Sequence, residues 1–333
     1  MDLAHIGEFG AIALFHQLLA ATSSDAAPRP EIGLGDDAAV WRPTEGRAVM
    51  ETTDLLIEEV HFSLRWCSWY DVGWKSMAVN VSDIAAMGGQ PRAAFVSAGL
   101  SPRMSQEDVL ELYRGLAECA AEYGLAILGG DTVASPQAAV VNVALYGETL
   151  DASGDVLRRD RARPGDRVAV TGPLGASAAY LRCHDGAFHA AHVHPQPRID
   201  LGQQLLRAGV RCAMDVSDGL LADLGKLCAA SSVGARLKAG LVPVAAAVQQ
   251  LLPDEALELA LTGGEDYELL ACGPKDVLES QGLTIVGEIV QGSGVRVFGP
   301  TGEELLFKGA GYDAFTPSAA AFAVRGGPGE GRG

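Results

Sequence analysis

The feature that most constrains this chain is an apolar helix pattern that contains a carboxylate. In residues 74–89 the apolar side chains recur at the spacing of one helix face, at Trp74, Met77, Ala78, Val81, Ile84 and Ala85. Asn80 and Asp83 interrupt this face three residues apart, near the predicted helix end at Gly88-Gly89. A carboxylate among apolar neighbours is costly to desolvate unless a cation or several donors meet it. Asp83 is therefore either a satisfied core residue that holds a turn or a functional group.

Length and charge narrow the class of protein. A chain of 333 residues predicts two domains, and 48% hydrophobic with 20% charged residues is an ordinary globular composition. The net charge of −17 argues against a binder of nucleic acid or anionic membranes, since both require a positive field. The excess of aspartate favours cations as ligands instead.

Cysteine usage and the N-terminus indicate a cytoplasmic protein. The six cysteines are scattered without a C-x-x-C pair, so we expect reduced thiols and neither a zinc site nor a disulfide framework. The first residues lack a basic segment, and polar residues interrupt their apolar run, so residues 7–20 predict a helix and not a signal peptide. No apolar run approaches the ~18 residues that span a bilayer.

Strand and helix patterns alternate along the chain and predict an α/β fold. Strands are expected at 48–53, 93–100 and 138–145, and a helix at 105–123 that Ser105 and Asp108 cap. A polar linker separates two domains. The predicted organisation is an N-terminal α/β domain at 1–148, a linker at 149–164, a C-terminal α/β domain at 165–317 and a flexible tail at 318–333.

Seven aspartates share one kind of context, a predicted turn or element end beside small residues. They are Asp36, Asp37, Asp54, Asp83, Asp131, Asp215 and Asp218. Each one alone is explained as a helix cap or turn former. Together, carboxylates at strand ends can converge at the edge of an α/β sheet, where they repel one another unless hard cations bind them. Mg²⁺ suits such a set, because it takes oxygen ligands and bridges carboxylates to phosphates.

Other nucleotide-binding signatures are absent. The chain has no G-x-x-x-x-G-K-[ST] and no G-x-G-x-x-G that opens a helix, so neither a P-loop nor a Rossmann fingerprint is predicted. Protein-kinase H-R-D and D-F-G motifs are absent as well.

An ordered series of segments resembles the thiamine-monophosphate kinase family. The series is GEFGAI (7–12), GLGDDAAV (33–40), TTDLLIEEVHF (52–62), GWKSMAVNVSDIAAMGGQP (73–91), LGGDT (128–132), HPQPR (194–198), AMDVSDGLLADL (213–224), LTGGEDYEL (261–269) and GYDAF (311–315). GGD or SDG alone is a weak signal, whereas the complete series is specific and covers the chain to about residue 315.

The resemblance implies a fold and a reaction. The fold is that of aminoimidazole ribonucleotide synthetase, with two α/β domains and N-terminal sheets that pair across a homodimer. The reaction transfers the γ-phosphoryl group of ATP to thiamine monophosphate, with several Mg²⁺ ions, and gives thiamine diphosphate. Such a transfer requires in-line positioning and charge neutralisation and no side-chain nucleophile.

The resemblance also implies roles for individual residues. Catalytic roles fall to Asp83, Asp131 and Asp218, with Asp83 bridging more than one ion. The implied metal ligands are Asp37, Thr52, Thr53, Asp54, Asp83, Asp131, Asp215 and Asp218. Contacts to ATP are implied for Gly130, Asp131, Arg159 and Ser217. Contacts to thiamine monophosphate are implied for His61, Glu265 and Tyr312, for which a structural His, a cap and a packed Tyr are the plain alternatives.

The chain departs from the family pattern twice. Asp160 and Arg161 stand where the family has Ser-Gly after Arg159, and Ala314 stands where His is usual.

Two other functions remain open. One is another ATP-using enzyme of the same superfamily, such as a purine-biosynthetic or selenophosphate synthetase, although the latter needs a reactive Cys near the N-terminus and the first is Cys67. The other is a nucleotide-binding module without turnover.

Overall fold

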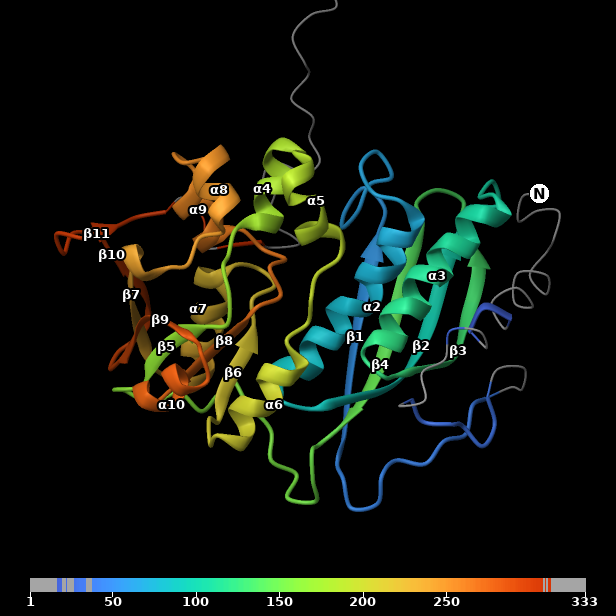
Figure 1. Cartoon of the computed structure of the whole chain (residues 1–333), viewed down its shortest axis with the longest axis horizontal. Helices are drawn as coiled ribbons and strands as arrows, with labels where there is room; N and C mark the ends of the chain where they lie inside the picture. The colour runs from blue at the N-terminus through green and yellow to red at the C-terminus, as the bar shows by residue number, and fades with distance from the viewer. Residues whose placement is uncertain are drawn as a thin grey trace, which may run out of the picture.

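The computed structural model describes residues 17–19, 22, 27–33, 38–307, 309 and 311–312. The predicted helix at 7–20 lies outside them except for 17–19, and the predicted tail at 318–333 lies outside them entirely. The described residues form two sheets that lie side by side, each with its own helices (Figure 1). The predicted α/β class with two domains is confirmed. All six cysteines are free thiols, and no described helix is long and apolar enough to cross a membrane.

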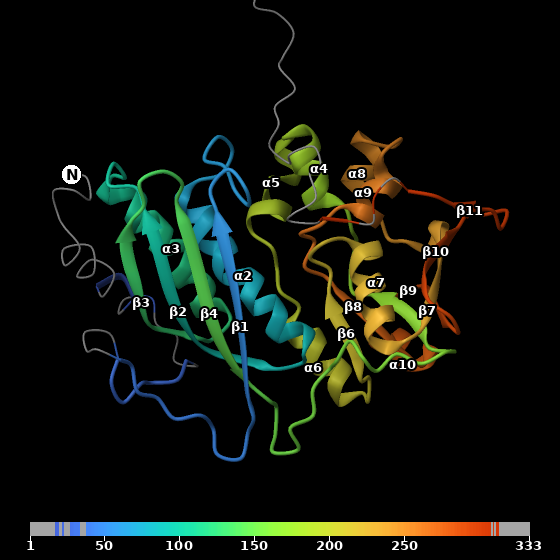
Figure 2. The ribbon, with the colours of Figure 1, turned by 180° about the vertical axis from the view of Figure 1, so that it is seen from behind.

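The N-terminal sheet has four strands in the order β1-β4-β2-β3. Their bounds are β1 Val49–Ile57, β2 Gln90–Leu100, β3 Ala126–Ala134 and β4 Val140–Glu148. Helices α2 (Trp69–Ala86) and α3 (Gln106–Glu122) cover one face. Seen from behind, the opposite face carries no helix of the described part (Figure 2). Ser105 and Asp108 form the predicted capping box at the start of α3.

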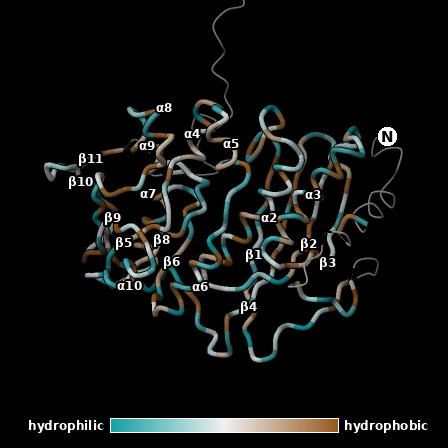
Figure 3. The backbone as a smooth tube through the Cα atoms, in the orientation of Figure 1, coloured by the Kyte–Doolittle hydropathy of each residue, from teal (hydrophilic) through white to brown (hydrophobic). Residues whose placement is uncertain are grey.

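The C-terminal sheet has seven strands in the order β11-β10-β7-β9-β5-β8-β6. The strands are β5 Arg167–Val170, β6 Cys212–Asp215, β7 Gly234–Lys238, β8 Leu269–Gly273, β9 Thr284–Val290, β10 Gly294–Phe298 and β11 Glu304–Leu305. The helices are α4 Ala176–Cys183, α5 Gly186–Val193, α6 Ile199–Arg207, α7 Leu220–Ser231, α8 Ala246–Leu251, α9 Ala256–Thr262 and α10 Lys275–Ser280, with a 3₁₀ turn at Ala239–Leu241. Hydrophobic stretches run through both halves of the molecule (Figure 3).

Helix α2 lies between the two halves and is buried almost all round. The six predicted apolar positions are buried, which confirms the core face of this helix. Its other sides are buried too, and only Tyr70 and Asp83 of its 18 residues are not. One apolar core continues from α2 into α6 and into one face of the C-terminal sheet, through residues such as Leu205, Ala213 and Leu269. The helix is therefore shared by both domains.

One predicted strand end is wrong, and one aspartate expected at an element end lies inside a strand. The strand predicted at 48–53 runs on to Ile57, because β4 pairs with all nine residues of β1. Asp54 consequently lies within a ladder and not beyond a strand end. Asp131 likewise lies inside β3, opposite Ser97 of β2. A polar side chain is tolerated at such positions because successive residues point to opposite faces of a strand.

Two glycines let α2 and α3 approach each other closely. A Cβ on Gly73 would overlap the carbonyl oxygen of Leu112, and a Cβ on Gly115 would overlap that of Tyr70. The backbones of the two helices therefore touch at a reciprocal glycine contact. Gly225, in α7, meets no atom within 4 Å of the corresponding position.

Substitution of Gly115 by Ala should destabilise the protein by about 1–3 kcal/mol, because α3 must move away from α2. The matched change Gly225→Ala should leave stability equal or raise it by up to about 1 kcal/mol, since alanine is the better helix former. Urea unfolding of both variants measures the two values. Equal stability of Gly115→Ala and the wild type would contradict the close approach.

Candidate active site between the two domains

Three aspartates from different elements meet where α2 passes the end of β6. Asp54 comes from β1, Asp83 from α2 and Asp215 from β6. The Thr52 hydroxyl donates to Asp83, and the Ser82 hydroxyl donates to Asp215 at 2.7 Å. Of the predicted metal ligands, the structure thus brings Thr52, Asp54, Asp83 and Asp215 into one group.

The pKa values of these carboxyl groups show that their charges interact. Burial raises the pKa of Asp54 to about 6, and the charges of Asp83 and Asp218 add to the rise. Burial and then Asp83 raise the pKa of Asp215, against the Ser82 hydrogen bond. The pKa of Asp83 is also raised by burial, although Thr52 and Arg159 oppose the shift. The cluster therefore holds negative charge that its own donors do not fully offset.

Asp218 reaches this group from the loop between β6 and α7. The buried carboxylate of Asp223 shapes the loop, because its Oδ2 accepts the backbone N–H groups of Ser217, Asp218 and Gly219 at 2.9–3.1 Å. Lys226 bridges Asp218 and Asp223. The N–H of Tyr312 donates to the carbonyl of Asp218 at 3.0 Å, which places the predicted substrate residue Tyr312 beside the loop.

A second group beside the acidic cluster is built around Glu265. Its backbone N–H donates to the carbonyl of Ser217 at 2.8 Å, and its φ of 65° lies in the left-handed region. Its carboxylate pairs with Lys75 of α2 at 2.8 Å and lies 3.3 Å from Nδ1 of His192. Lys75 Nζ is 3.4 Å from Nε2 of the same imidazole. His61 interacts electrostatically with both Glu265 and Lys75.

Burial and the lysine decide the protonation of this group. Burial would raise the pKa of Glu265, but Lys75 and His192 outweigh it and lower the pKa below its usual value. Burial, followed by the charge of Lys75, lowers the pKa of His192 to about 3. The pKa of His61 is lowered by its burial, with Glu265 opposing the shift. The stable state near pH 7 is an ionised Lys75–Glu265 pair beside a neutral His192.

Other predicted residues lie elsewhere. Thr53 accepts a 2.8 Å hydrogen bond from Asn142, and Asn142 and Asp131 both pair with Ser97 of β2, so Thr53 and Asp131 face away from the helices. Asp54 pairs with buried Val143 and therefore faces the helix layer. Gly130 is exposed next to Asp131, and Asp37 lies outside the described residues. Arg159, in the linker, lies close enough to Asp83 to lower its pKa.

The donor set suits a hard cation, although the described side chains do not complete a site alone. No group of three or more Asp, Glu, His or Cys residues lies in metal-binding geometry within the described ranges. The clustered donors are carboxylates and the Thr52 hydroxyl, which are oxygen ligands of the kind that Mg²⁺ takes. The raised pKa values of Asp54 and Asp215 indicate excess negative charge that a cation would offset.

Sequence reasoning missed Lys75, His192, Asp223 and Asp266. Lys75 stands in the middle of an apolar helix pattern, where an uncompensated charge is costly. The argument that singled out Asp83 as a buried charge therefore holds equally for Lys75. Asp266 accepts the N–H of Gly175 at the start of α4, at 2.9 Å. Nothing in the spacing of the sequence places His192 beside Glu265.

Comparison with known proteins defines the class to which this fold and site belong. Residues 35–149 match the family model for the N-terminal domain of AIR synthase related proteins, and residues 163–299 match the model for the C-terminal domain. Structures of the hydrogenase maturation protein HypE share the fold, with a TM-score of 0.71 at 20% identity. The two-domain architecture is therefore that of the AIR synthase related proteins.

Closer relatives define the family within this class. Thiamine-monophosphate kinase of Escherichia coli is 34% identical over 93% of this chain and 98% of its own length. The Methanopyrus kandleri enzyme is 36% identical over 80% of this chain and 86% of its own length. The crystal structure of the Stenotrophomonas maltophilia kinase aligns with a TM-score of 0.77 at 34% identity, over 88% of this chain and 97% of that one. The chain belongs to the thiamine-monophosphate kinase family.

Acidification should destabilise the fold through His192. The folded state lowers the pKa of His192 from 6.5 to about 3, so only the unfolded chain takes up this proton between those values. The contribution of His192 is complete above pH 6.5 and falls by about 2 kcal/mol by pH 5. We expect the stability difference between wild type and His192→Gln to shrink by this amount between pH 7.5 and 5, as measured by urea unfolding.

A stability difference between His192→Gln and the wild type that stays constant from pH 7.5 to 5 would contradict this account, because the imidazole of His192 would then not be held neutral in the fold.

Proposed function

We propose that this chain transfers the γ-phosphoryl group of ATP to the phosphate of thiamine monophosphate and forms thiamine diphosphate. The observation that carries the proposal is the acidic cluster beside the Lys75–Glu265 pair, at the junction of two domains in a chain of this family. A structure of the relative AaThiL with AMPPCP and TMP supports both substrates, with 30% identity and a TM-score of 0.72 over 94% of this chain and 99% of that one. AMPPCP is an analogue of ATP whose terminal phosphoryl group is not readily transferred, and TMP is thiamine monophosphate.

On the nucleotide side, we propose that Arg159, Ser217, Gly130 and Asp131 contact ATP. The charge of Arg159 lies near Asp83, so the arginine can approach phosphates held at the acidic cluster. Ser217 belongs to the loop that Asp223 fixes. Phosphoryl transfer depends on positioning and on charge neutralisation, and a rigid loop and a nearby guanidinium serve those ends.

We further propose that Mg²⁺ binds at the acidic cluster, with catalytic roles for Asp83, Asp131 and Asp218. The proposed ligands in the cluster are Thr52, Asp54, Asp83, Asp215 and Asp218. For Thr53 and Asp131, on the opposite face of the sheet, and for Asp37, outside the described residues, the ligand role stays a prediction from the sequence. When bound, the ions would offset the negative charge of the polyphosphate and of the carboxylates. The proposal is supported by the interacting charges of Asp54, Asp83 and Asp215.

On the acceptor side, we propose that His61, Glu265 and Tyr312 bind thiamine monophosphate. Glu265 is held ionised by Lys75 and can accept from an amino group of the acceptor. His61 is half-buried beside this pair. Tyr312 is 41% exposed next to the Asp218 loop, so its ring is free to stack on an aromatic ligand.

We also propose that two copies pair through the uncovered face of the N-terminal sheet, and that the protein works in the cytoplasm with reduced cysteines. Large apolar side chains are exposed on this face, with Leu55 at 47% and Val133 at 57%. Exposed apolar patches of this kind mark interfaces. Thr53 and Asp131 lie on the same face, so a second sheet would enclose these two proposed ligands.

The substitution Asp83→Asn should abolish turnover without loss of stability. We expect kcat to fall at least about 10²-fold, since the variant lacks the central charge of the cluster. Thermal unfolding should occur at an equal or higher temperature, because the repulsion of Asp83 with Asp54 and Asp215 is removed. Asp254→Asn, at an exposed loop position, should leave both quantities unchanged. Near-normal activity of Asp83→Asn would refute the role of Asp83.

The reaction is tested by following ADP and thiamine diphosphate together, with ATP, thiamine monophosphate and Mg²⁺, and with a control that contains EDTA. Equal amounts of both products, lost with EDTA, are expected. ADP without thiamine diphosphate would indicate a different acceptor on the same fold. Absence of ADP would indicate a binding module without turnover.

The proposed interface is tested by the substitution Leu55→Asp. A buried aspartate in the sheet interface is costly, so the variant should be monomeric by light scattering while the wild type is dimeric. Leu251→Asp, at an exposed leucine of α8, should remain dimeric. A dimeric Leu55→Asp variant or a monomeric wild type would contradict this interface.

A further inference from the structure

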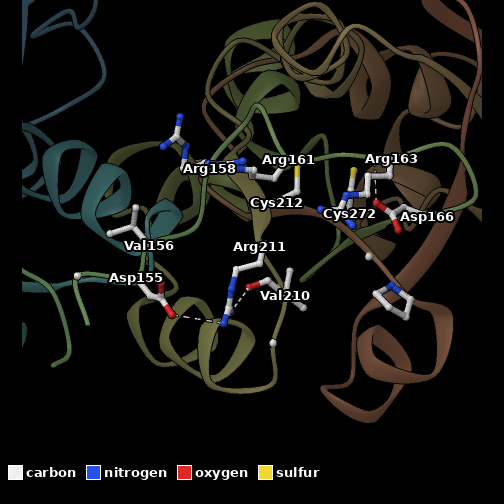
Figure 4. Close-up of a pocket in the computed structure, with 14 residues that line it drawn as sticks. Asp155, Val156, Arg158, Arg161, Arg163, Asp166, Val210, Arg211, Cys212 and Cys272 are labelled. Atoms are coloured by element: carbon white, nitrogen blue, oxygen red, sulfur yellow. Dashed lines mark hydrogen bonds and ion pairs between the residues drawn. The ribbon is translucent and has the colours of Figure 1, made fainter. Parts of the chain in front are cut away.

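A pocket lies at the end of β6 remote from Asp215, and its rim is rich in arginine. Its volume is about 490 Å³. Arg158, Arg161 and Arg163 of the linker and Arg211 surround it, and Val210, Cys212 and Cys272 lie at its inner side (Figure 4). Cys212 begins β6 and Asp215 ends it, which separates the pocket from the acidic cluster by about 10 Å of strand.

The charge of this pocket is opposite to that of the molecule. Four arginines line it against two aspartates, Asp155 and Asp166, and a third aspartate, Asp160, pairs with Arg158 and Arg161. One positive charge is left in excess, in a chain of net charge −17. Its inner side is uncharged, and Val210, Cys212 and Cys272 are at most 2% exposed. An apolar wall lowers the local dielectric constant and strengthens the attraction of the arginines for an anion.

The arginines are only partly neutralised by protein acids. Among the described residues, the guanidinium of Arg163 has no acidic partner, since Asp166 accepts the backbone N–H of Arg163. Arg211 donates to the carbonyls of Leu206 and Val210 and lies 3.5 Å from Asp155. These carbonyl contacts fix the Arg211 side chain without cancelling its charge.

Two of the residues concerned are those at which this chain departs from its family. Arg161 and Asp160 replace the expected Gly and Ser. Arg161 adds a fourth cation to the rim. Asp160 adds an acid beside the rim, where it pairs with Arg158 through hydrogen bonds of 2.8 and 2.6 Å and lies 3.5 Å from Arg161. The departures thus add one cation and one anion, and they order the arginines of the linker without raising the net charge of the pocket.

We propose that this pocket binds the phosphate group of a small ligand, either inorganic phosphate or a phosphate monoester. The planar guanidinium group donates two parallel hydrogen bonds to phosphate oxygens, and several arginines around one concave surface suit a dianion. The ligand would join the linker to the first residue of β6 and to the end of β8. The site is separate from the one that the kinase reaction requires.

Calorimetric titration of the full chain with inorganic phosphate and with adenosine monophosphate, at constant ionic strength set by chloride, tests the proposal. The variant Arg163→Ala/Arg211→Ala should bind the preferred probe at least about tenfold more weakly, because two charge-assisted contacts are lost. The control Arg103→Ala/Arg207→Ala removes the same charge outside the pocket and should bind like the wild type. Preference for one probe distinguishes the free anion from a monoester. Turnover is not involved, so the result is independent of the proposed reaction.

Hydrogen exchange locates the bound probe independently of the variants. Phosphate should slow exchange at residues 154–163 and 209–212. Protection confined to residues 216–219 would place the ligand at the active site and overturn the proposal. No binding of either probe, or equal binding by both double variants, would overturn it as well.

Discussion

The structure depends on the burial of α2 between two sheets. A helix in this position must be apolar on nearly all sides, and every charge that it carries needs a partner from another element. Lys75 pairs with Glu265, and Asp83 accepts a hydrogen bond from the hydroxyl of Thr52. The Lys75–Glu265 pair, together with the Ser82–Asp215 hydrogen bond, ties the N-terminal domain to segments of the C-terminal domain. The same contacts that satisfy the helix therefore assemble the site, which explains why the site lies at the junction of the domains.

The site combines a satisfied part with an unsatisfied part. Around Glu265 the charges balance, and the lowered pKa of this residue shows that the fold stabilises its ionised form. Around Asp83 they do not, and burial together with neighbouring carboxylates raises the pKa of Asp54 and Asp215. Proteins of marginal stability retain such repulsion where function requires it. The distinction agrees with an acceptor pocket next to a cation-dependent nucleotide pocket.

Much of the fold could be predicted from local patterns. The apolar face of α2, its end at the glycines and the Ser105–Asp108 capping box are local features, and the structure confirms them. The end of β1 could not be predicted, because pairing with β4 keeps Thr52 and Asp54 inside the ladder. Register decides that Asp54 faces the helices while Thr53 faces the opposite side. Thr53 and Asp54 are neighbours with the same predicted context, and the alternation of side chains along a strand sends them to opposite faces of the sheet.

The sequence by itself determined the class of fold, the family and the residue types of the site. Helix periodicity, caps and the ordered motif series are properties of neighbouring residues, and they survive without knowledge of long-range contacts. Only the tertiary structure decided which aspartates interact, that His192 lies beside Glu265 and that linker arginines surround a pocket. Those relations join residues far apart in the sequence, 29 positions for Asp54 and Asp83 and 73 for His192 and Glu265. Their geometry follows from sheet register and from the packing of α2, which no local pattern encodes.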